Sequence, residues 1–148
     1  MKIIQKNKKA YFDYEILQGF TAGITLTGPE TKSVRNGNVN LKGSYVSIQN
    51  GEAFIKSMDI SKYAYNQSAE YDPFRIRKLL LNKREIEKIT SQLNTQGVTV
   101  IALVIGLEGR YVKVIIGLAR GKKKFDKRET LKKRDQKRTI DKLVKSYR

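Results

Sequence analysis

The chain has 148 residues, with 31 Lys or Arg against 14 Asp or Glu and a net charge of +17, a size that suits one domain with an appended segment. It contains no Cys and no His, which excludes disulfides, thiolate chemistry, and the commonest general base and metal ligand. No apolar run approaches the roughly 20 residues that cross a bilayer, and the N-terminus lacks a signal-peptide apolar region, so we expect a cytoplasmic, non-enzymatic protein without a cofactor.

Two strands are expected near the N-terminus. Apolar and polar residues alternate over residues 12–16, beginning with Phe12, which predicts a half-buried strand. The same alternation over residues 20–26 predicts a second strand, and Gln18-Gly19 between them favours a turn.

Residues 28–37 predict a short helix. Pro29 suits the first helical position and Gly37 the left-handed conformation that closes a helix. Glu30 and Arg35 complement the helix dipole at its two ends. Glu30 has a second interpretation, because its carboxylate can accept from a base amino group or a ribose hydroxyl, or orient neighbouring cations.

The clearest hairpin surrounds Asn50-Gly51, the preferred pair for a type I′ turn. Residues 44–49 and 52–57 on either side are rich in β-formers. The periodicity then fails over residues 59–71, which predicts a loop containing aromatic residues.

Asp72-Pro73 is typical of a helix start, and we expect a second short helix over residues 72–81. Three consecutive leucines on a helix point about 100° apart and cannot share one face. Either the helix is wedged between two layers and buries all three, or one or two form an apolar RNA contact beside Arg77 and Lys78.

Asn82 and Glu85 resemble a capping box, so a third helix is expected to follow, ending before Gly97. The amide of Asn82 can also read a base. Residues 98–107 and 111–119 predict a final hairpin, and its first strand is apolar on both faces, so it is expected to lie centrally under a helix.

Many short strands with few helices predict a mainly β fold: a small closed OB-like barrel of about six strands with three helices. We assign the barrel, as an RNA-binding domain, to residues 1–120 and a basic tail to residues 121–148. The basic run Lys6, Lys8 and Lys9 is usually only solvated, but here it adds to a total that indicates phosphate contact.

The tail holds thirteen Lys or Arg against four acids, so it carries +9 of the chain's +17. It has too few apolar residues to offset its ordering entropy, and we expect it to be disordered in isolation and to bind a polyanion. Phe125 has no core to join and favours base stacking over incidental packing. The last apolar residues of the tail fall at helical spacing, which predicts that the tail folds into a helix on contact with RNA: Ile140, Leu143, Val144 and Tyr147. A basic surface could also bind anionic lipid, but these four residues offer only weak apolar anchors, so RNA is favoured over lipid.

Three segments together resemble the SsrA-binding protein (small protein B) family. They are residues 22–37, residues 72–81, and residues 117–123 followed by Asp126-Lys127-Arg128. The resemblance covers nearly the whole chain. It departs at Thr31, where the family often has Val, and at Tyr71 and Phe125, where it often has His.

The resemblance implies an OB-like barrel that binds the tRNA-like domain of transfer-messenger RNA (tmRNA). It also implies delivery of that RNA to stalled ribosomes for trans-translation, with elongation factor Tu as a companion, and a tail that becomes helical in the empty mRNA channel. We expect a monomer. A general single-stranded nucleic-acid-binding OB protein remains the main alternative, and a carboxylate-metal nuclease a second.

The residues and the resemblance together predict RNA-binding positions at Lys8, Lys9, Gly28, Glu30, Lys32, Ser33, Arg35, Arg77, Lys78, Leu79, Leu80, Asn82, Lys122 and Lys123. The ribosome-binding positions predicted in the tail are Gly121, Lys122, Lys123, Phe125, Asp126, Lys127, Arg128, Lys132, Lys133, Arg134 and Arg138.

Overall fold

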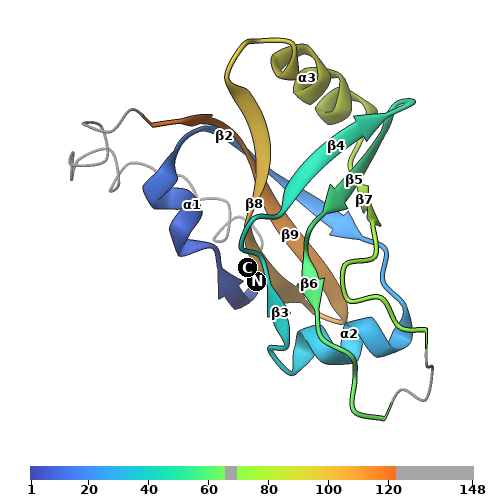
Figure 1. Ribbon diagram of the computed structural model, residues 1–148. Coiled ribbons are helices and arrows are strands. Elements are labelled where there is room, and N and C mark those ends of the chain that lie inside the picture. Colours follow the sequence, from blue (N-terminus) through green and yellow to red (C-terminus); the bar gives the residue numbers. More distant parts are fainter. Residues whose placement is uncertain (66–69, 123–148) are drawn as a thin grey trace.

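The structure is a computed structural model that describes residues 1–65 and 70–122. Its elements in chain order (Figure 1) are β1 (Lys2–Lys6), α1 (Lys8–Asp13), β2 (Tyr14–Ile24), α2 (Gly28–Arg35), β3 (Val39–Asn40), β4 (Tyr45–Gln49), β5 (Glu52–Lys56), β6 (Asp59–Ile60), β7 (Arg77–Leu80), α3 (Lys83–Leu93), β8 (Val98–Glu108) and β9 (Tyr111–Gly121). Within the described ranges, none of the helices has the length and apolar character that a bilayer crossing requires.

Six strands pair in the order β8-β4-β5-β7-β2-β9, and β9 pairs back with β8, so the sheet closes into a ring. β1 adds to β8 beside β4, while β3 and β6 form a separate two-stranded ribbon. All of these pairings are antiparallel. The predicted mainly β fold, with about six strands in a closed arrangement and three short helices, is confirmed for the described part of the chain.

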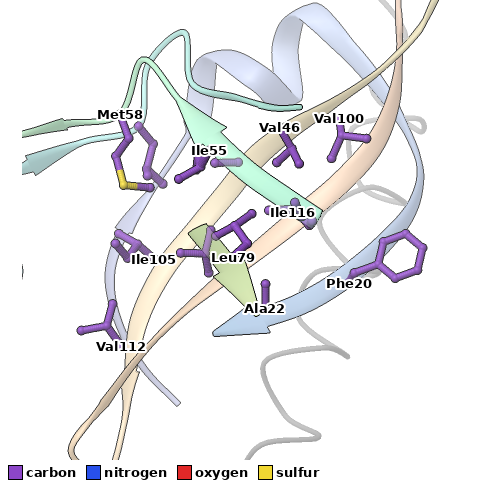
Figure 2. Packing of buried hydrophobic residues seen from close by; sticks show 14 of the residues in the cluster. Phe20, Ala22, Val46, Ile55, Met58, Leu79, Val100, Ile105, Val112 and Ile116 are labelled. Carbon is purple, nitrogen blue, oxygen red and sulfur yellow. The ribbon is translucent and has the colours of Figure 1, made fainter. Parts of the chain in front are cut away.

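The main core fills the interior of the ring. Because side chains alternate across a strand, each strand sends every second residue inward. Figure 2 shows these inward side chains converging from different strands, among them Phe20, Val46, Ile55, Leu79 and Ile116. Burial of this apolar surface drives the closure of the ring.

A second, smaller core lies between the outer face of the sheet and α1. It consists of Ala10, Ile101, Leu103, Val104, Ile115 and Ala119. The expectation that the strand beginning at residue 98 lies under a helix is confirmed, because β8 contributes to both cores. Asn7 joins this helix to the ring: it caps α1, and its amide nitrogen donates to the carbonyl oxygens of Ala102 (2.9 Å) and Leu41 (3.3 Å).

Most predictions based on turn chemistry hold. The hairpin at Asn50-Gly51 is present, and both residues have positive φ, 53° and 75°. The helix beginning at Gly28, the helix that Asn82 caps, and the final β8–β9 hairpin are also confirmed.

The predicted N-terminal strands are wrong in their boundaries. Residues 12–16 and 20–26 do not form two strands, because β2 is one continuous strand with an irregularity in its pairing between Ile16 and Gln18. Phe12 lies in α1. The basic run begins at Lys6, the last residue of the unpredicted strand β1, and continues at Lys8 and Lys9, the first residues of α1. The alternation runs from the last two residues of α1, Phe12 and Asp13, into β2, so periodicity alone could not separate the helix from the strand.

The predicted helix over residues 72–81 is also wrong. The Asp72 carboxylate accepts from the backbone N–H of Phe74, which forms a turn, and the chain then enters β7. In a strand Leu79 points into the core, whereas Leu80 points outward and is 56% exposed. The expected loop over residues 59–71 likewise begins with a short strand, β6.

The helices α2 and α3 lie at opposite ends of the molecule, and α1 covers one side (Figure 1). β7 runs between these ends, from a turn near α2 to the N-terminus of α3. Because β7 is one of the strands of the ring, Leu80 lies on its outer surface while Leu79 faces the core.

Candidate nucleic-acid interface

The N-terminus of α2 is built by a reciprocal capping box. The Thr27 hydroxyl accepts from the backbone N–H of Glu30 at 3.3 Å, and the Glu30 carboxylate accepts from the N–H of Thr27 at 2.9 Å. Such a box satisfies two donors that the first helical turn leaves unpaired. It also fixes the Glu30 side chain against the body of the protein, where it is only 1% exposed.

Two arginines converge on this carboxylate, Arg75 from the turn before β7 and Arg77 from the first position of β7. Arg75 Nη2 lies 2.6 Å from Glu30 Oε1, and Arg77 Nε and Nη2 lie 2.7 and 2.6 Å from Oε2. We call Glu30, Arg75 and Arg77 the Glu30 cluster. Charge-assisted bonds of this kind are the strong ones, and two guanidinium forks fix direction as well as distance.

Arg77 is fully buried and extends the cluster to other segments. Its guanidinium donates to the carbonyl oxygens of Met58 at 2.8 Å and Pro73 at 3.1 Å. One side chain therefore ties α2, the chain after β5 and the turn before β7 together. The cluster sets the point at which β7 enters the sheet.

The electrostatics of the cluster favour ionised Glu30. Burial acts to raise its pKa, but the bonds from Arg75, Thr27 and Arg77 and the Arg77 charge outweigh burial and lower the pKa from 4.5 to about 2. The same hydrogen bond to Glu30 raises the pKa of Arg75. Nearby, burial raises the pKa of Tyr71, whose hydroxyl donates to the Ile60 carbonyl oxygen.

The outward face of β7 is apolar and basic. Leu80 lies over Gly23 of β2: a Cβ added to this glycine would stand 3.3 Å from the Leu80 Cβ. Lys78 makes a loose, exposed ion pair with Glu52 at 3.3 Å. A groove of about 390 Å³ beside them is lined by Gly51, Glu52, Ala53, Lys78, Leu79, Leu80, Leu81 and Ile86.

The exposed side of α2 adds cations to the same end of the molecule. The Lys32 ammonium lies 5.4 Å from the ring centroid of Tyr63, within the range of a cation–π contact. Arg35 Nη2 donates to the Arg110 carbonyl oxygen at 3.0 Å. An apolar strand face next to ordered cations is the mixed surface that RNA loops with splayed bases require.

Four of the predicted RNA-binding side chains are buried. Glu30, Ser33, Arg77 and Leu79 are each at most 1% exposed, so a direct contact by these side chains does not fit the structure. Glu30 and Arg77 position the surface instead. The capping interpretation of Asn82 is confirmed, since its Oδ1 accepts from the N–H of Glu85 at 2.9 Å.

The remaining described candidates divide into two groups. Gly28, Lys32, Arg35, Lys78 and Leu80 are exposed at or near α2 and β7. Lys8 and Lys9 are exposed on α1, which covers a different side of the ring, so the structure does not bring them into this surface (Figure 1).

Of the predicted tail residues, Gly121 and Lys122 are described. Gly121 ends β9, and Lys122 donates its backbone N–H to the carbonyl oxygen of Asp13 and its Nζ to that of Tyr11. The other predicted tail positions lie outside the described residues: Lys123, Phe125, Asp126, Lys127, Arg128, Lys132, Lys133, Arg134 and Arg138.

Sequence reasoning missed the role of Arg75 and of Tyr63. The spacing of Arg75 and Arg77, two residues apart, indicates a shared strand face, but the predicted helix concealed it. In the described part of the chain, no group of three or more Asp or Glu could hold a metal ion.

Comparisons with known proteins point to one family. The model of the SmpB protein family matches residues 4–146. The chain is 45% identical to the SsrA-binding protein of Enterococcus hirae over 99% of this chain and 95% of that protein. It is 46% identical to the SsrA-binding protein of Persephonella marina over 98% of this chain and 95% of that protein. A solved structure described as "tmRNA-SmpB: a journey to the center of the bacterial ribosome" contains a chain that is 40% identical, with a TM-score of 0.69 over 92% of this chain and 96% of that one.

The ion pairs of Glu30 differ sharply in burial from that of Glu52, which allows a matched test. Glu30→Gln leaves the buried Arg77 charge without its counter-ion, so we expect a loss of about 3 kcal/mol of unfolding free energy. Glu52→Gln removes an exposed ion pair of Lys78, and a loss below about 1 kcal/mol is expected. Urea denaturation near neutral pH measures both, and equal losses would contradict the role given to the Glu30 cluster.

The pKa of Glu30 predicts a specific acid sensitivity. Because folding lowers this pKa from 4.5 to about 2, the stability that ionised Glu30 contributes is present above pH 4.5 and is lost as the pH falls toward 2. The difference in unfolding free energy between the native chain and Glu30→Gln is therefore expected to narrow across this window. Denaturation series at several pH values check it, and a constant difference would show that Glu30 does not titrate there.

Proposed function

The chain belongs to the SsrA-binding protein (SmpB) family, and we propose that it binds the tRNA-like domain of tmRNA and delivers this RNA to stalled ribosomes for trans-translation. The observation that carries the proposal is the solved relative described with tmRNA and the bacterial ribosome, which is 40% identical over 92% of this chain. In this role the protein is a non-enzymatic, monomeric adaptor that acts in the cytoplasm, with elongation factor Tu as a companion in delivery.

The surface formed by α2 and β7 is the part of the ring that we assign to the RNA. Leu80 offers an apolar contact to an unstacked base, and Lys32, Arg35 and Lys78 lie near it for phosphates. The Glu30 cluster, in which Glu30 and Arg77 are buried, does not contact RNA in this proposal. It holds β7 in the register that turns Leu80 and Lys78 outward.

The basic tail is assigned to the ribosome. Residues 121–148 carry +9, and this charge suits ribosomal RNA around the decoding site and along the empty mRNA channel. Lys122 adds a structural argument, because its bonds to the carbonyl oxygens at the end of α1 fix where the tail leaves the ring. We infer that the tail senses the absence of downstream message.

A general single-stranded nucleic-acid-binding protein is the second candidate, which the closed β ring and the basic charge also suit. The two candidates differ in selectivity. An adaptor binds one folded RNA more tightly than other RNAs. The affinity of a general binder depends instead on the number of phosphates that it contacts and on the salt concentration.

A competition experiment separates these functions. The binding of labelled tRNA-like domain of tmRNA is measured near physiological salt for the full chain and for residues 1–122. Excess bulk tRNA and unstructured RNA serve as competitors. We expect selective binding by both proteins, because recognition lies on the ring. The shortened chain is expected to lose tagging of stalled nascent chains in a translation assay. Binding that any RNA displaces would favour the general binder, and normal tagging by the shortened chain would remove the tail from the mechanism.

Leu80→Ala tests the apolar contact on β7. Loss of this side chain is expected to weaken binding of the tRNA-like domain about tenfold, a value that corresponds to roughly 1.4 kcal/mol of buried apolar contact. Leu17→Ala is the matched control, since Leu17 is an exposed leucine of β2 at 42%. Unchanged affinity in Leu80→Ala would remove β7 from the interface, and urea denaturation confirms that both variants fold.

A further inference from the structure

We propose that the RNA surface continues from β7 across β2 to β9, where Lys113 binds a backbone phosphate and Tyr111 stacks on an unpaired base. The proposal rests on the proposed function, because it extends the same interface. It adds residues on a strand and a turn to which neither the sequence motifs nor the comparisons assign a role.

The strand register carries the first step. Leu80 of β7 pairs with Gly23 of β2, and Gly23 pairs with Lys113 of β9. Lys113 pairs in turn with Gly106 of β8, and Gly106 with Ile3 of β1. Paired residues in a sheet point to the same face, so Leu80 and Lys113 belong to one row on the outside of the ring.

The two glycines in this row leave Lys113 between apolar neighbours. Leu80 lies over Gly23, and the Met1 side chain lies over Gly106, where an added Cβ would stand 2.9 Å from the Met1 sulfur. Lys113 is half-buried, and its ammonium makes no hydrogen bond or ion pair with any residue in the ranges 1–65 and 70–122. A cation held among apolar groups without a counter-ion is suited to an anionic ligand, here a phosphate.

Tyr111 lies two residues before Lys113 on the same face of β9. Its ring is 67% exposed, although an aromatic side chain of this size usually buries most of its surface. An exposed ring next to an unpaired cation is the arrangement with which proteins stack an unstacked base beside its phosphate.

The turn that presents Tyr111 is anchored. Gly109 takes a positive φ of 59°, which closes the tight β8–β9 connection. The Arg35 guanidinium of α2 donates to the Arg110 carbonyl oxygen at 3.0 Å, so the turn is tied to the helix already assigned to the interface. Tyr111 is therefore held in place before any ligand binds, which lowers the entropy cost of stacking.

The charge of the surroundings favours RNA over a protein partner. Arg35, Arg110 and Lys113 lie around the turn, and Glu108, which pairs with Tyr111, is the acid that faces them on the β8–β9 hairpin. The excess of cations continues to Lys32 and Lys78. A single RNA segment passing from β7 to the turn would meet more cations than acids along its path, since Glu52 and Glu108 lie beside these cations.

The test compares variants of the full chain in binding to labelled tRNA-like domain of tmRNA over a series of salt concentrations. Tyr111→Ala is expected to weaken binding about tenfold, and Tyr111→Phe less than about twofold, because stacking needs the ring and not the hydroxyl. Lys113→Gln is expected to weaken binding a few-fold. It is also expected to reduce the dependence of log affinity on log salt concentration by the amount that corresponds to about one phosphate contact. Tyr45→Ala is the control, since Tyr45 is an exposed tyrosine at 42% that pairs with the opposite end of β8.

The outcomes separate this inference from the proposed function. Selective binding by the native chain that Leu80→Ala weakens, together with unchanged binding by Tyr111→Ala and Lys113→Gln, would confine the interface to β7 and overturn the extension. Equal losses in Tyr111→Ala and Tyr111→Phe would overturn stacking. A native chain without preference for this RNA over bulk tRNA would overturn the proposed function, and the extension with it. Matching urea midpoints show that the losses are not due to unfolding.

Discussion

A buried carboxylate between two guanidinium groups is the interaction on which the functional surface depends. Glu30 comes from the first turn of α2, whereas Arg75 and Arg77 come from a segment that joins the sheet far later in the chain. Burying the charges of Glu30 and Arg77 is costly, and buried ion pairs often add little net stability. We take the role of this cluster to be specificity: it allows one entry point for β7 and one relative placement of helix and strand.

That placement decides what reaches the surface. Once Arg77 points inward, the alternation of a strand directs Lys78 and Leu80 outward, and a shift by one residue would reverse both. Leu80 lies against Gly23 of β2, where a side chain would crowd it, because an added Cβ would stand 3.3 Å from the Leu80 Cβ. The exposed apolar and basic groups are thus a consequence of a buried polar contact several ångströms beneath them.

The surface proposed for RNA and the start of the tail lie on different parts of the ring. α1 covers another side of the sheet with its own small core, and Lys122 is bonded to the last carbonyl oxygens of this helix. The RNA surface proposed on α2 and β7 and the start of the tail are therefore supported by different elements. An adaptor that must hold one RNA while probing another benefits from this division.

Local chemistry in the sequence by itself determined the turns, the caps and the class of fold. Asn50-Gly51 forms its hairpin and Asn82 its capping box, because these depend on residues within three or four positions. The tertiary structure alone decided the path of residues 72–81. Pro after Asp and a run of leucines satisfy a helix as well as a strand. The choice is made by Glu30, which is distant in sequence and pairs with the buried Arg77 and the partly exposed Arg75. For the same reason the sequence could suggest Glu30 as important but could not show that it acts from beneath the surface.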